Sequence, residues 1–287
     1  MEYFFKEVSL LAQKALVYEV LLTPKPGLVD RNNSGAHDDM DIFTFMDSIL
    51  VLEEYFKNCT SVGYFHDGDD FSKIFDSIRP LGVEAEEKMF SATKGINTHK
   101  GAIFIFGILC AAIGSLKGKD EAINLNSITQ RGGSISQNIL KDFDVDFLSK
   151  KILTYGESQF VKYGNYGIRG EAKEGFPSIK IAYNTLIECI NKGYDFQISM
   201  GESLLKLMET VFDSNVVGRT EIEGLELMRK YVKEVNALGG FKTIEGMCKL
   251  EEIDKIFVKK RISPGGCADL CAATVFIYCT NEWLENL

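Results

Sequence analysis

Apolar residues recur at spacings of three and four along most of this chain. Residues 3–22 carry such a stripe, and residues 42–57 carry another. This spacing places apolar side chains on one face of an α-helix. It also predicts helices at residues 71–92, 99–117, 121–139, 145–161, 178–192, 196–212, 220–237, 241–257 and 266–284. Stretches that alternate like strands are short, so we predict an all-α protein, a single domain over residues 1–287 with about 10 to 12 helices.

The most apolar segment runs from Gly101 to Leu116 without a charged residue. A helix needs about 20 apolar residues to cross a bilayer, so we predict a buried central helix and no membrane partner. The first residues show no cationic stretch followed by a long apolar run, which argues against a secretory signal. Seven scattered cysteines without a CxxC pair indicate reduced, buried thiols. We therefore expect a cytoplasmic protein, and the apolar faces of so many helices allow a homodimer.

The chain is acidic, with a formal charge of −9 from 41 acidic and 32 basic residues. Nonspecific binding to nucleic acid needs a basic face that displaces counterions, so we expect no nucleic-acid partner. An anionic small molecule would need a local cluster of Lys, Arg or backbone amides.

Five connectors between the predicted helices are dense in glycine, proline, charged and amide residues. Loops held by rigid elements commonly carry binding and catalytic groups. We therefore expect the five connectors to converge on one polar cleft. They are Thr23–Asp41, Gly95–Gly101, Tyr163–Gly175, Asp213–Thr220 and Ser263–Asp269.

The first connector combines cations, glycines and carboxylates. Lys25 and Arg31 can meet phosphates, and Gly27 permits close approach of a ligand. Asn33 and Ser34 belong to the same candidate substrate-binding set. Mg²⁺ prefers carboxylate oxygens, which this connector supplies at Asp30, Asp38, Asp39 and Asp41. The alternative is that these aspartates cap the next helix and complement its dipole.

The second connector leads into the apolar helix. The N-terminus of a helix attracts anions, so a phosphate fits this position, with His99 as an acid, a base or a phosphate donor. A purely structural histidine is the alternative. The candidate ligands are Asn97, Thr98, Lys100 and Gly101. No GxxxxGK[ST] or GxGxxG motif occurs in the chain.

The third connector offers the aromatic face of Tyr166 to a purine and the guanidinium of Arg169 to phosphate, beside Gly170 and Glu171.

The last two connectors each precede a predicted helix. Asp213 can bind a metal or cap a helix. Ser263, Gly265 and Gly266 leave amides bare for phosphate, and Asp269 follows in the first turn, where an ordinary cap is the alternative. Two helical glutamates near polar loops, Glu19 and Glu86, can serve as metal ligands or bases, or lie on a solvated face.

Together these connectors resemble the signature segments of the triphosphoribosyl-dephospho-CoA synthase family. The matching segments are LTPKPGLVDRNNSGAHDDMD at 22–41, GINTHKGAIF at 95–104, GIRGEA at 167–172 with GFPS at 175–178, and SPGGCADL at 263–270. They occur in the family's order and span nearly the whole chain.

The resemblance implies an all-helical enzyme that transfers the triphosphoribosyl group of ATP to the 2′-hydroxyl of 3′-dephospho-CoA and releases adenine. The product is the prosthetic-group precursor for the acyl-carrier subunit of citrate lyase or malonate decarboxylase. ATP and 3′-dephospho-CoA are then the substrates, and Mg²⁺ is expected with ATP.

Such a reaction breaks an N-glycosidic bond and preserves the triphosphate. Carboxylates near ribose C1 stabilise the positive charge that develops, and one of them takes the proton of the incoming hydroxyl. The candidates for this base are Asp30, Asp39 and Glu171, and His37 or His99 can help adenine leave. The candidate metal ligands are Glu19, Asp38, Asp41, Glu86, Asp213 and Asp269.

One segment departs from the family pattern. A stretch like His-Arg-Gly-Gly is expected after Val216, but the chain has Val217-Gly218-Arg219-Thr220 and keeps only Arg219, a candidate substrate ligand. This departure leaves open a sensor that binds ATP without releasing adenine. A helical hydrolase of ADP-ribose N-glycosides would share such acidic loops, whereas a helical protein scaffold has little need of them.

Overall fold

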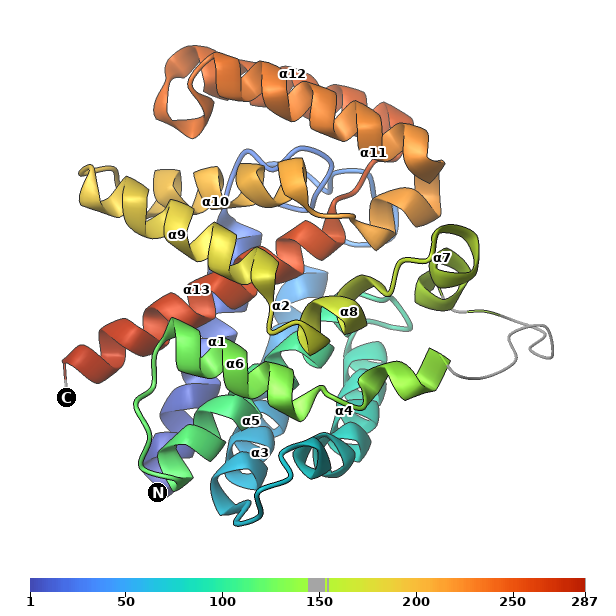
Figure 1. Cartoon of the computed structure of the whole chain (residues 1–287). Helices are drawn as coiled ribbons and strands as arrows, with labels where there is room; N and C mark the ends of the chain where they lie inside the picture. The colour runs from blue at the N-terminus through green and yellow to red at the C-terminus, as the bar shows by residue number, and fades with distance from the viewer. Residues whose placement is uncertain (144–152, 154, 287) are drawn as a thin grey trace. The chain divides into compact units, whose positions relative to one another are not determined.

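The structure is a computed structural model that describes residues 1–143, 153 and 155–286. Every regular element in this part of the chain is helical, which confirms the predicted all-α class, with one helix more than the upper end of the predicted range (Figure 1). The thirteen α-helices are α1 (Glu2–Leu21), α2 (Ile42–Leu50), α3 (Glu53–Phe65), α4 (Ser72–Ala92), α5 (Lys100–Gly118), α6 (Leu125–Ile135), α7 (Tyr155–Tyr163), α8 (Gly167–Lys173), α9 (Pro177–Asn191), α10 (Phe196–Thr210), α11 (Ser214–Ala237), α12 (Ile244–Lys260) and α13 (Gly265–Glu285). Two short 3₁₀ helices are η1 (Ile139–Phe143) and η3 (Gly240–Lys242).

The predicted single helix over residues 42–57 is wrong, because the structure has two helices there. α2 ends at Leu50 and α3 begins at Glu53, with a turn at residues 51–52. Leu52 is fully buried at this turn, so the spacing of apolar residues continues across the break. No glycine or proline marks the turn, which is why periodicity alone merged the two helices.

Two of the predicted connectors contain helix. α8 lies within the Tyr163–Gly175 connector, and α11 already begins at Ser214. α11 is kinked at Glu221, whose φ of 59° and ψ of −167° are not helical. The helix predicted at 220–237 is therefore the longer part of α11.

Two further predictions are shortened or only partly described. The helix predicted at 121–139 is the shorter α6, which begins at a capping box formed by Asn124 and Ser127 and is followed by η1. Of the helix predicted at 145–161, residues 145–152 and 154 lie outside the described residues.

Packing divides the chain into two units. Unit 1 comprises Met1–Val17, Met46–Pro177 and Phe276–Leu287, and unit 2 comprises Tyr18–Phe45 and Ser178–Val275. α1 and α13 therefore contribute residues to both units. The expectation that the whole chain folds as a single domain stays a prediction.

α5 is the buried central helix of unit 1, as predicted. Almost every residue from Ala102 to Leu116 is buried. Of the described helices, α5 is the one long and apolar enough to span a membrane, but 78% of its most apolar window is buried inside the protein. Burial in the core accounts for this apolar character.

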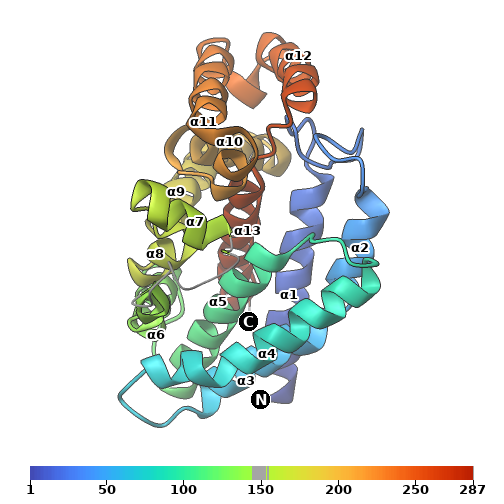
Figure 2. The same cartoon turned by 90° about the vertical axis from the view of Figure 1, so that its right-hand side faces the viewer.

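Backbone contact between α3 and α5 sets the packing of unit 1, and α4 packs against the same pair (Figure 2). A Cβ atom on Gly63 would lie 1.9 Å from the carbonyl oxygen of Ala111, and one on Gly114 would lie 1.9 Å from that of Thr60. No side chain larger than hydrogen fits at these two positions, so the two helices are as close as their backbones allow.

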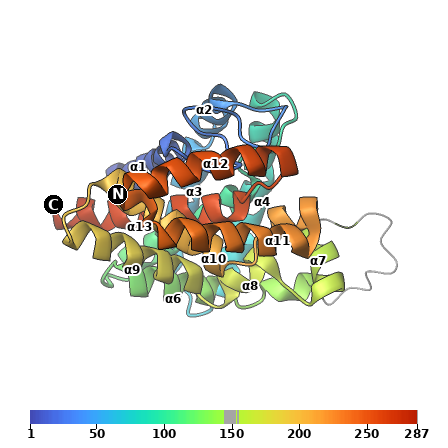
Figure 3. The ribbon, with the colours of Figure 1, turned by 90° about the horizontal axis from the view of Figure 1, so that it is seen from above.

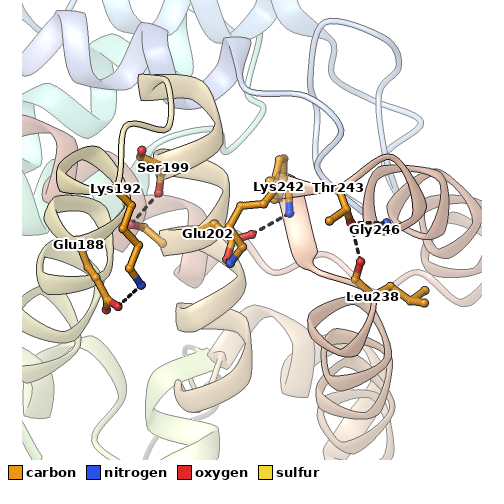
Figure 4. A network of polar contacts seen from close by, with 10 residues as sticks. Glu188, Lys192, Ser199, Glu202, Leu238, Lys242, Thr243 and Gly246 are labelled. Carbon is orange, nitrogen blue, oxygen red and sulfur yellow. Dashed lines mark hydrogen bonds and ion pairs between the residues drawn. The ribbon is translucent and has the colours of Figure 1, made fainter.

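In unit 2, α11 and α12 run alongside each other and pack with α10 around η3 (Figure 3). Glu202 of α10 accepts a hydrogen bond from the backbone N–H of Phe241 at 2.7 Å and pairs with Lys242 at 2.5 Å (Figure 4). Thr243 caps the start of α12 by accepting from the N–H of Gly246 at 3.1 Å. A buried carboxylate therefore holds the turn between α11 and α12 onto α10.

Replacing Gly114 by alanine should lower the free energy of unfolding by about 2–4 kcal/mol, because the Thr60 backbone cannot move aside without separating α3 from α5. Urea denaturation followed by circular dichroism measures the change. Gly82→Ala in α4 is the control, since its Cβ would meet only the Tyr55 hydroxyl at 3.4 Å. That variant should be stabilised by about 0.5–1 kcal/mol, and equal effects of the two substitutions would contradict the close packing.

Candidate active site

Asp30 organises the first connector, which belongs to unit 2. Its Oδ2 accepts hydrogen bonds from the Thr23 hydroxyl at 2.6 Å and the Lys25 N–H at 3.0 Å. Its Oδ1 accepts from the N–H groups of Asn32 at 2.7 Å and Asn33 at 3.0 Å. These four donors occupy both oxygens of a buried carboxylate. The geometry favours a loop-organising role for Asp30, and its role as a general base stays a prediction.

Asp254 of α12 also holds this connector. Its carboxylate accepts from the Gly27 N–H at 2.9 Å and from the Asn33 side-chain amide at 2.9 Å. Gly27 has a φ of 74°, and a Cβ there would lie 2.0 Å from the carbonyl oxygen of Ile262. Packing therefore already requires this glycine. The sequence analysis missed Asp254, because an acidic residue in a polar helix carries no local signal of a distant partner.

Lys25 and Glu19 form a buried ion pair in unit 2. Lys25 is 2% exposed and Glu19 is 5% exposed, and the lysine Nζ donates to Glu19 Oε1. Lys25, which we predicted to bind phosphate, is thus held by Glu19, which we predicted to bind a metal ion. The two residues act as one group, since removing either would leave an uncompensated buried charge.

Asp269 lies near the start of α13 but just past its first turn, where the sequence had placed it. Burial raises the pKa of its carboxyl well above the usual range, and the charges of Glu19 and Asp213 raise it further. The side chain is half-buried, and no residue that the structure describes donates a hydrogen bond or forms an ion pair with it. A partly accessible carboxylate crowded by like charges is typical of a functional site.

Asp213 ties the start of α11 to the start of α13 within unit 2. Its Oδ1 accepts from the N–H groups of Asn215 at 2.8 Å and Val216 at 3.1 Å, and its Oδ2 accepts from that of Cys267 at 2.8 Å. Burial raises the pKa of this carboxyl, and the backbone hydrogen bonds oppose the rise. Both oxygens serve backbone amides, so the geometry favours capping over metal binding.

His37 brings the first, fourth and fifth connectors together. Its Nε2 lies 2.9 Å from Ser263 Oγ, and its Nδ1 lies 3.3 Å from an Arg219 nitrogen and 3.7 Å from Asp39 Oδ1. Arg219 also donates to the Ala36 carbonyl oxygen at 3.2 Å. Burial, followed by the Arg219 charge, lowers the pKa of His37, while Asp39 opposes that change. The lowered pKa favours the neutral imidazole.

The other carboxylates of the first connector face solvent. The Asp38 side chain is 94% exposed and reaches Arg261 at 3.5 Å, and that of Asp39 is 62% exposed. Asp41 caps α2 by accepting from the Thr44 N–H at 2.9 Å, as the alternative interpretation predicted. Within the described ranges, no three His, Cys, Asp or Glu side chains form a metal-binding group.

The remaining predicted ligands of unit 2 lie near its surface. Arg31 and Asn33 are exposed, whereas Ser34, Gly265 and Gly266 are half-buried. Gly265 and Gly266 open α13, where their amides stand at the positive end of the helix dipole. Ser263 precedes them, with Pro264 in between, and is buried. The Gly265 N–H donates to the Ser263 carbonyl oxygen at 2.9 Å, so the Gly266 amide is the one that fits an anion better than the solvated side chains of Arg31 and Asn33 do.

In unit 1, Ser48 links two residues of the second connector. Its Oγ lies 2.7 Å from His99 Nδ1 and accepts from the Thr98 hydroxyl at 2.8 Å. Ser48 and His99 are both buried. The sequence analysis missed Ser48, although a serine next to the buried face of a predicted helix signals a hidden polar partner.

Lys100 stands in the first turn of α5, followed by Gly101. Its Nζ pairs with Glu86 at 2.7 Å, yet 51% of its side chain remains exposed. The Asn97 side chain accepts from the Lys100 N–H at 3.3 Å and so contributes to the helix start. Lys100 can still reach a phosphate, while Glu86 is engaged by that lysine.

The third connector, also in unit 1, packs its aromatic group against neighbours. Tyr166 stacks on Phe160 with ring centroids 4.7 Å apart and meets Phe143 edge-on at 5.3 Å. Arg169 lies over the Phe143 ring at 5.3 Å. Gly170 lies against Tyr166, since its Cβ would meet that of Tyr166 at 3.0 Å. Glu171 lies in α8, where its carbonyl oxygen accepts from the Phe176 N–H at 2.8 Å.

Three of the five connectors therefore meet in unit 2, around His37 and Asp213. The two connectors of unit 1 form their own polar groups, around Ser48 and around Tyr166. Convergence of all five on one cleft stays a prediction.

Comparison with known proteins identifies the chain's relatives. The sequence profile described as "ATP:dephospho-CoA triphosphoribosyl transferase" matches residues 5–286. The chain belongs to this family. A probable 2-(5''-triphosphoribosyl)-3'-dephosphocoenzyme-A synthase of Streptococcus mutans is 38% identical over 98% of this chain and 97% of its own length. No solved structure matches.

Two other relatives carry the same description. A probable 2-(5''-triphosphoribosyl)-3'-dephosphocoenzyme-A synthase of Vibrio cholerae is 38% identical over 94% of this chain and 87% of its own length. The synthase of Pectobacterium atrosepticum is 35% identical over 96% and 90%. Membership in the ATP:dephospho-CoA triphosphoribosyl transferase family confirms the resemblance that the connectors predicted, and with it an enzyme of the transferase class.

Replacing Asp269 by asparagine should stabilise the protein, and more so at higher pH. The folded pKa of Asp269 is raised above the unfolded value of about 4, so its contribution to stability is complete below that pH and is lost as the pH rises through the folded pKa. Asparagine carries no charge at any pH. In thermal unfolding without Mg²⁺, the variant should exceed the wild type in stability by a larger margin at pH 8 than at pH 5.

The control for this prediction is Asp38→Asn, whose side chain is 94% exposed. Its stability relative to the wild type should not change with pH. A stability difference for Asp269→Asn that is the same at pH 5 and pH 8 would contradict a strained carboxylate at this position.

Proposed function

We propose that this chain transfers the triphosphoribosyl group of ATP to the 2′-hydroxyl of 3′-dephospho-CoA and releases adenine. The observation that carries the proposal is the family match over residues 5–286, which includes all five polar connectors. The product serves as the prosthetic-group precursor for the acyl-carrier subunit of citrate lyase or malonate decarboxylase.

The proposed transfer reaction determines which groups the active site must provide. The bond between ribose C1 and an adenine nitrogen breaks, and its electron pair leaves with adenine. A new bond forms between C1 and the hydroxyl oxygen of 3′-dephospho-CoA. The hydroxyl proton passes to a base, and adenine gains a proton as it leaves. The triphosphate stays intact, so the protein must hold phosphates and keep nucleophiles away from phosphorus.

In unit 2, the start of α13 is the best-supported phosphate site. The Ser263 hydroxyl and the Gly266 amide are candidate donors at the positive end of a 21-residue helix, whereas the Gly265 N–H already donates to the Ser263 carbonyl oxygen at 2.9 Å. The buried Lys25–Glu19 pair belongs to the same unit and supplies a held cation. Lys100 and Arg169 are the corresponding candidates in unit 1.

Asp39 is the best candidate in unit 2 for the base that takes the hydroxyl proton. Its carboxylate is 62% exposed and lies 3.7 Å from His37, whose lowered pKa favours the neutral imidazole. Asp30, by contrast, has four donors on its two oxygens, so both oxygens are already occupied. His37 and His99 stay the candidates that protonate adenine, and Glu171 stays the alternative base.

Mg²⁺ fits Asp269 better than the other predicted ligands, since Glu19 is already paired with Lys25. Asp269 is partly accessible, lacks a donor among the described residues and is crowded by Glu19, which is the charge pattern that a cation relieves. Mg²⁺ is usually held by one or two carboxylates together with substrate phosphates, so a preformed group of three ligands is not needed. When bound, it would neutralise triphosphate charge.

The compartment and assembly belong to the same proposal. All seven cysteines are free and six are buried, which suits a reducing cytoplasm. α2 exposes Phe43 at 73% and Leu50 at 71%, and such apolar side chains suit a homodimer contact.

Adenine release tests the proposed reaction. The protein is incubated with Mg-ATP, with and without 3′-dephospho-CoA, and adenine is measured by chromatography. Release should depend on 3′-dephospho-CoA, because the hydroxyl is the acceptor. Release without the acceptor would indicate a hydrolase of N-glycosides. No release in either reaction, with ATP still bound, would indicate a nucleotide sensor.

Asp39→Asn should lower adenine release by at least about 100-fold, because the amide cannot accept the hydroxyl proton. Asp30→Asn is the matched comparison. It should lower thermal stability, since an amide nitrogen cannot accept the backbone hydrogen bonds made by Asp30. Near-normal turnover of Asp39→Asn would eliminate Asp39 as the base and return that role to Asp30 or Glu171.

A further inference from the structure

The hydrogen bond between Arg219 and His37 has a direction that chemistry alone determines. A guanidinium group only donates hydrogen bonds. Nδ1 of His37, 3.3 Å from the Arg219 nitrogen, therefore presents its lone pair. A neutral imidazole carries one N–H group, so the proton sits on Nε2, which points to Ser263 Oγ at 2.9 Å.

Asp39 competes for the same ring nitrogen and favours the opposite tautomer. A carboxylate only accepts hydrogen bonds, so Asp39, 3.7 Å from Nδ1, would need a proton on that nitrogen. Arg219 is nearer, and a second bond to the Ala36 carbonyl oxygen at 3.2 Å steadies it. The other charged group close to His37 is Asp38, which reaches Arg261 at 3.5 Å.

The tautomer determines what the Ser263 hydroxyl can do. When Ser263 Oγ accepts the Nε2 proton, its own hydrogen is available for another acceptor. Ser263 directly precedes Pro264, Gly265 and Gly266 at the start of α13. A deprotonated phosphate oxygen is an acceptor only, so it matches this donor and would not match the lone pair of a serine that donates to histidine.

We propose that Arg219 is a positioning residue that holds His37 in the Nε2–H tautomer and thereby presents the Ser263 hydroxyl as a donor to a substrate phosphate. This inference rests on the proposed function, because both ATP and 3′-dephospho-CoA carry phosphate groups. It also explains why an arginine is useful at a position where the neighbouring sequence departs from the family pattern. Arg219 acts through the imidazole rather than on the substrate.

The tautomer is measured on the free, full-length protein with ¹⁵N-labelled histidine. The chain has three histidines, so comparison with His37→Gln assigns the His37 signals. At pH 8, long-range ¹H–¹⁵N correlation should show the Nε2–H pattern in the wild type and in Arg219→Lys, which keeps a cationic donor. Arg219→Met should shift His37 toward the Nδ1–H form, with Asp39 as acceptor. Arg261→Met, a second exposed arginine next to this connector, should leave His37 unchanged.

Ligand affinity tests the second half of the inference. Calorimetric titrations with ATP and, separately, with 3′-dephospho-CoA identify which phosphate Ser263 contacts. For that ligand, Arg219→Met and Ser263→Ala should each raise Kd by about five-fold, the typical effect of one hydrogen bond. The double variant should be no weaker than the weaker single variant, because both changes remove the same contact.

Three outcomes would overturn the inference. His37 could keep the Nε2–H form in Arg219→Met, the two substitutions could multiply in their effects on Kd, or neither ligand could respond to Ser263→Ala. Arg219 is exposed, so the Arg219 variants should fold. Arg219→Lys, which keeps a cationic donor, serves as a second test of the tautomer. Failure of the proposed function is a separate result, because it appears as absence of adenine release while tautomer and affinity are still measured.

Discussion

Backbone N–H groups in the connectors of unit 2, three of which form buried hydrogen bonds, need acceptors, and three carboxylates supply them. Asp30 satisfies amides within the first connector, Asp254 anchors that connector to α12, and Asp213 joins the starts of α11 and α13. An unsatisfied buried amide costs as much as a lost hydrogen bond. Because these acceptors are charged, their hydrogen bonds are stronger than those between neutral groups, and they hold irregular loops in place. The placement of His37 and Ser263 depends on this arrangement.

Near the start of α13, the carboxylate of Asp269 adds negative charge that does not stabilise the fold. Asp269 carries a raised pKa beside Glu19 and Asp213, and only Glu19 has a buried cationic partner, Lys25. Proteins retain such unfavourable groups where activity needs them. A triphosphate with its cation would bring both the positive charge that Asp269 lacks and the negative charge that the amides of α13 can bind. The electrostatic pattern and the proposed substrates therefore agree.

Several features of the fold and site were predictable because they depend on local chemistry. The apolar residues identified the buried helix α5. Its long run of apolar residues without a charge is stable only in the core. The glycines and prolines of the Thr23–Asp41 and Ser263–Asp269 segments marked loops rather than helices. Long-range partners were not predictable. Ser48, Asp254 and the role of Arg219 each depend on a residue 50 or more positions away, and no spacing rule reaches that far. The break between α2 and α3 was missed because Leu52 keeps the apolar period while the backbone turns.

The sequence by itself determined the helical class, the positions of the polar connectors and the family. Each of these depends on short segments, in which the residue types themselves favour a helix, a loop or a family motif. Only the tertiary structure decided which carboxylates accept hydrogen bonds from backbone amides and which remain accessible. Asp30, Asp39, Asp213 and Asp269 are chemically identical side chains. What separates them is burial and the number of donors each meets, and those donors come from parts of the chain that only folding brings together.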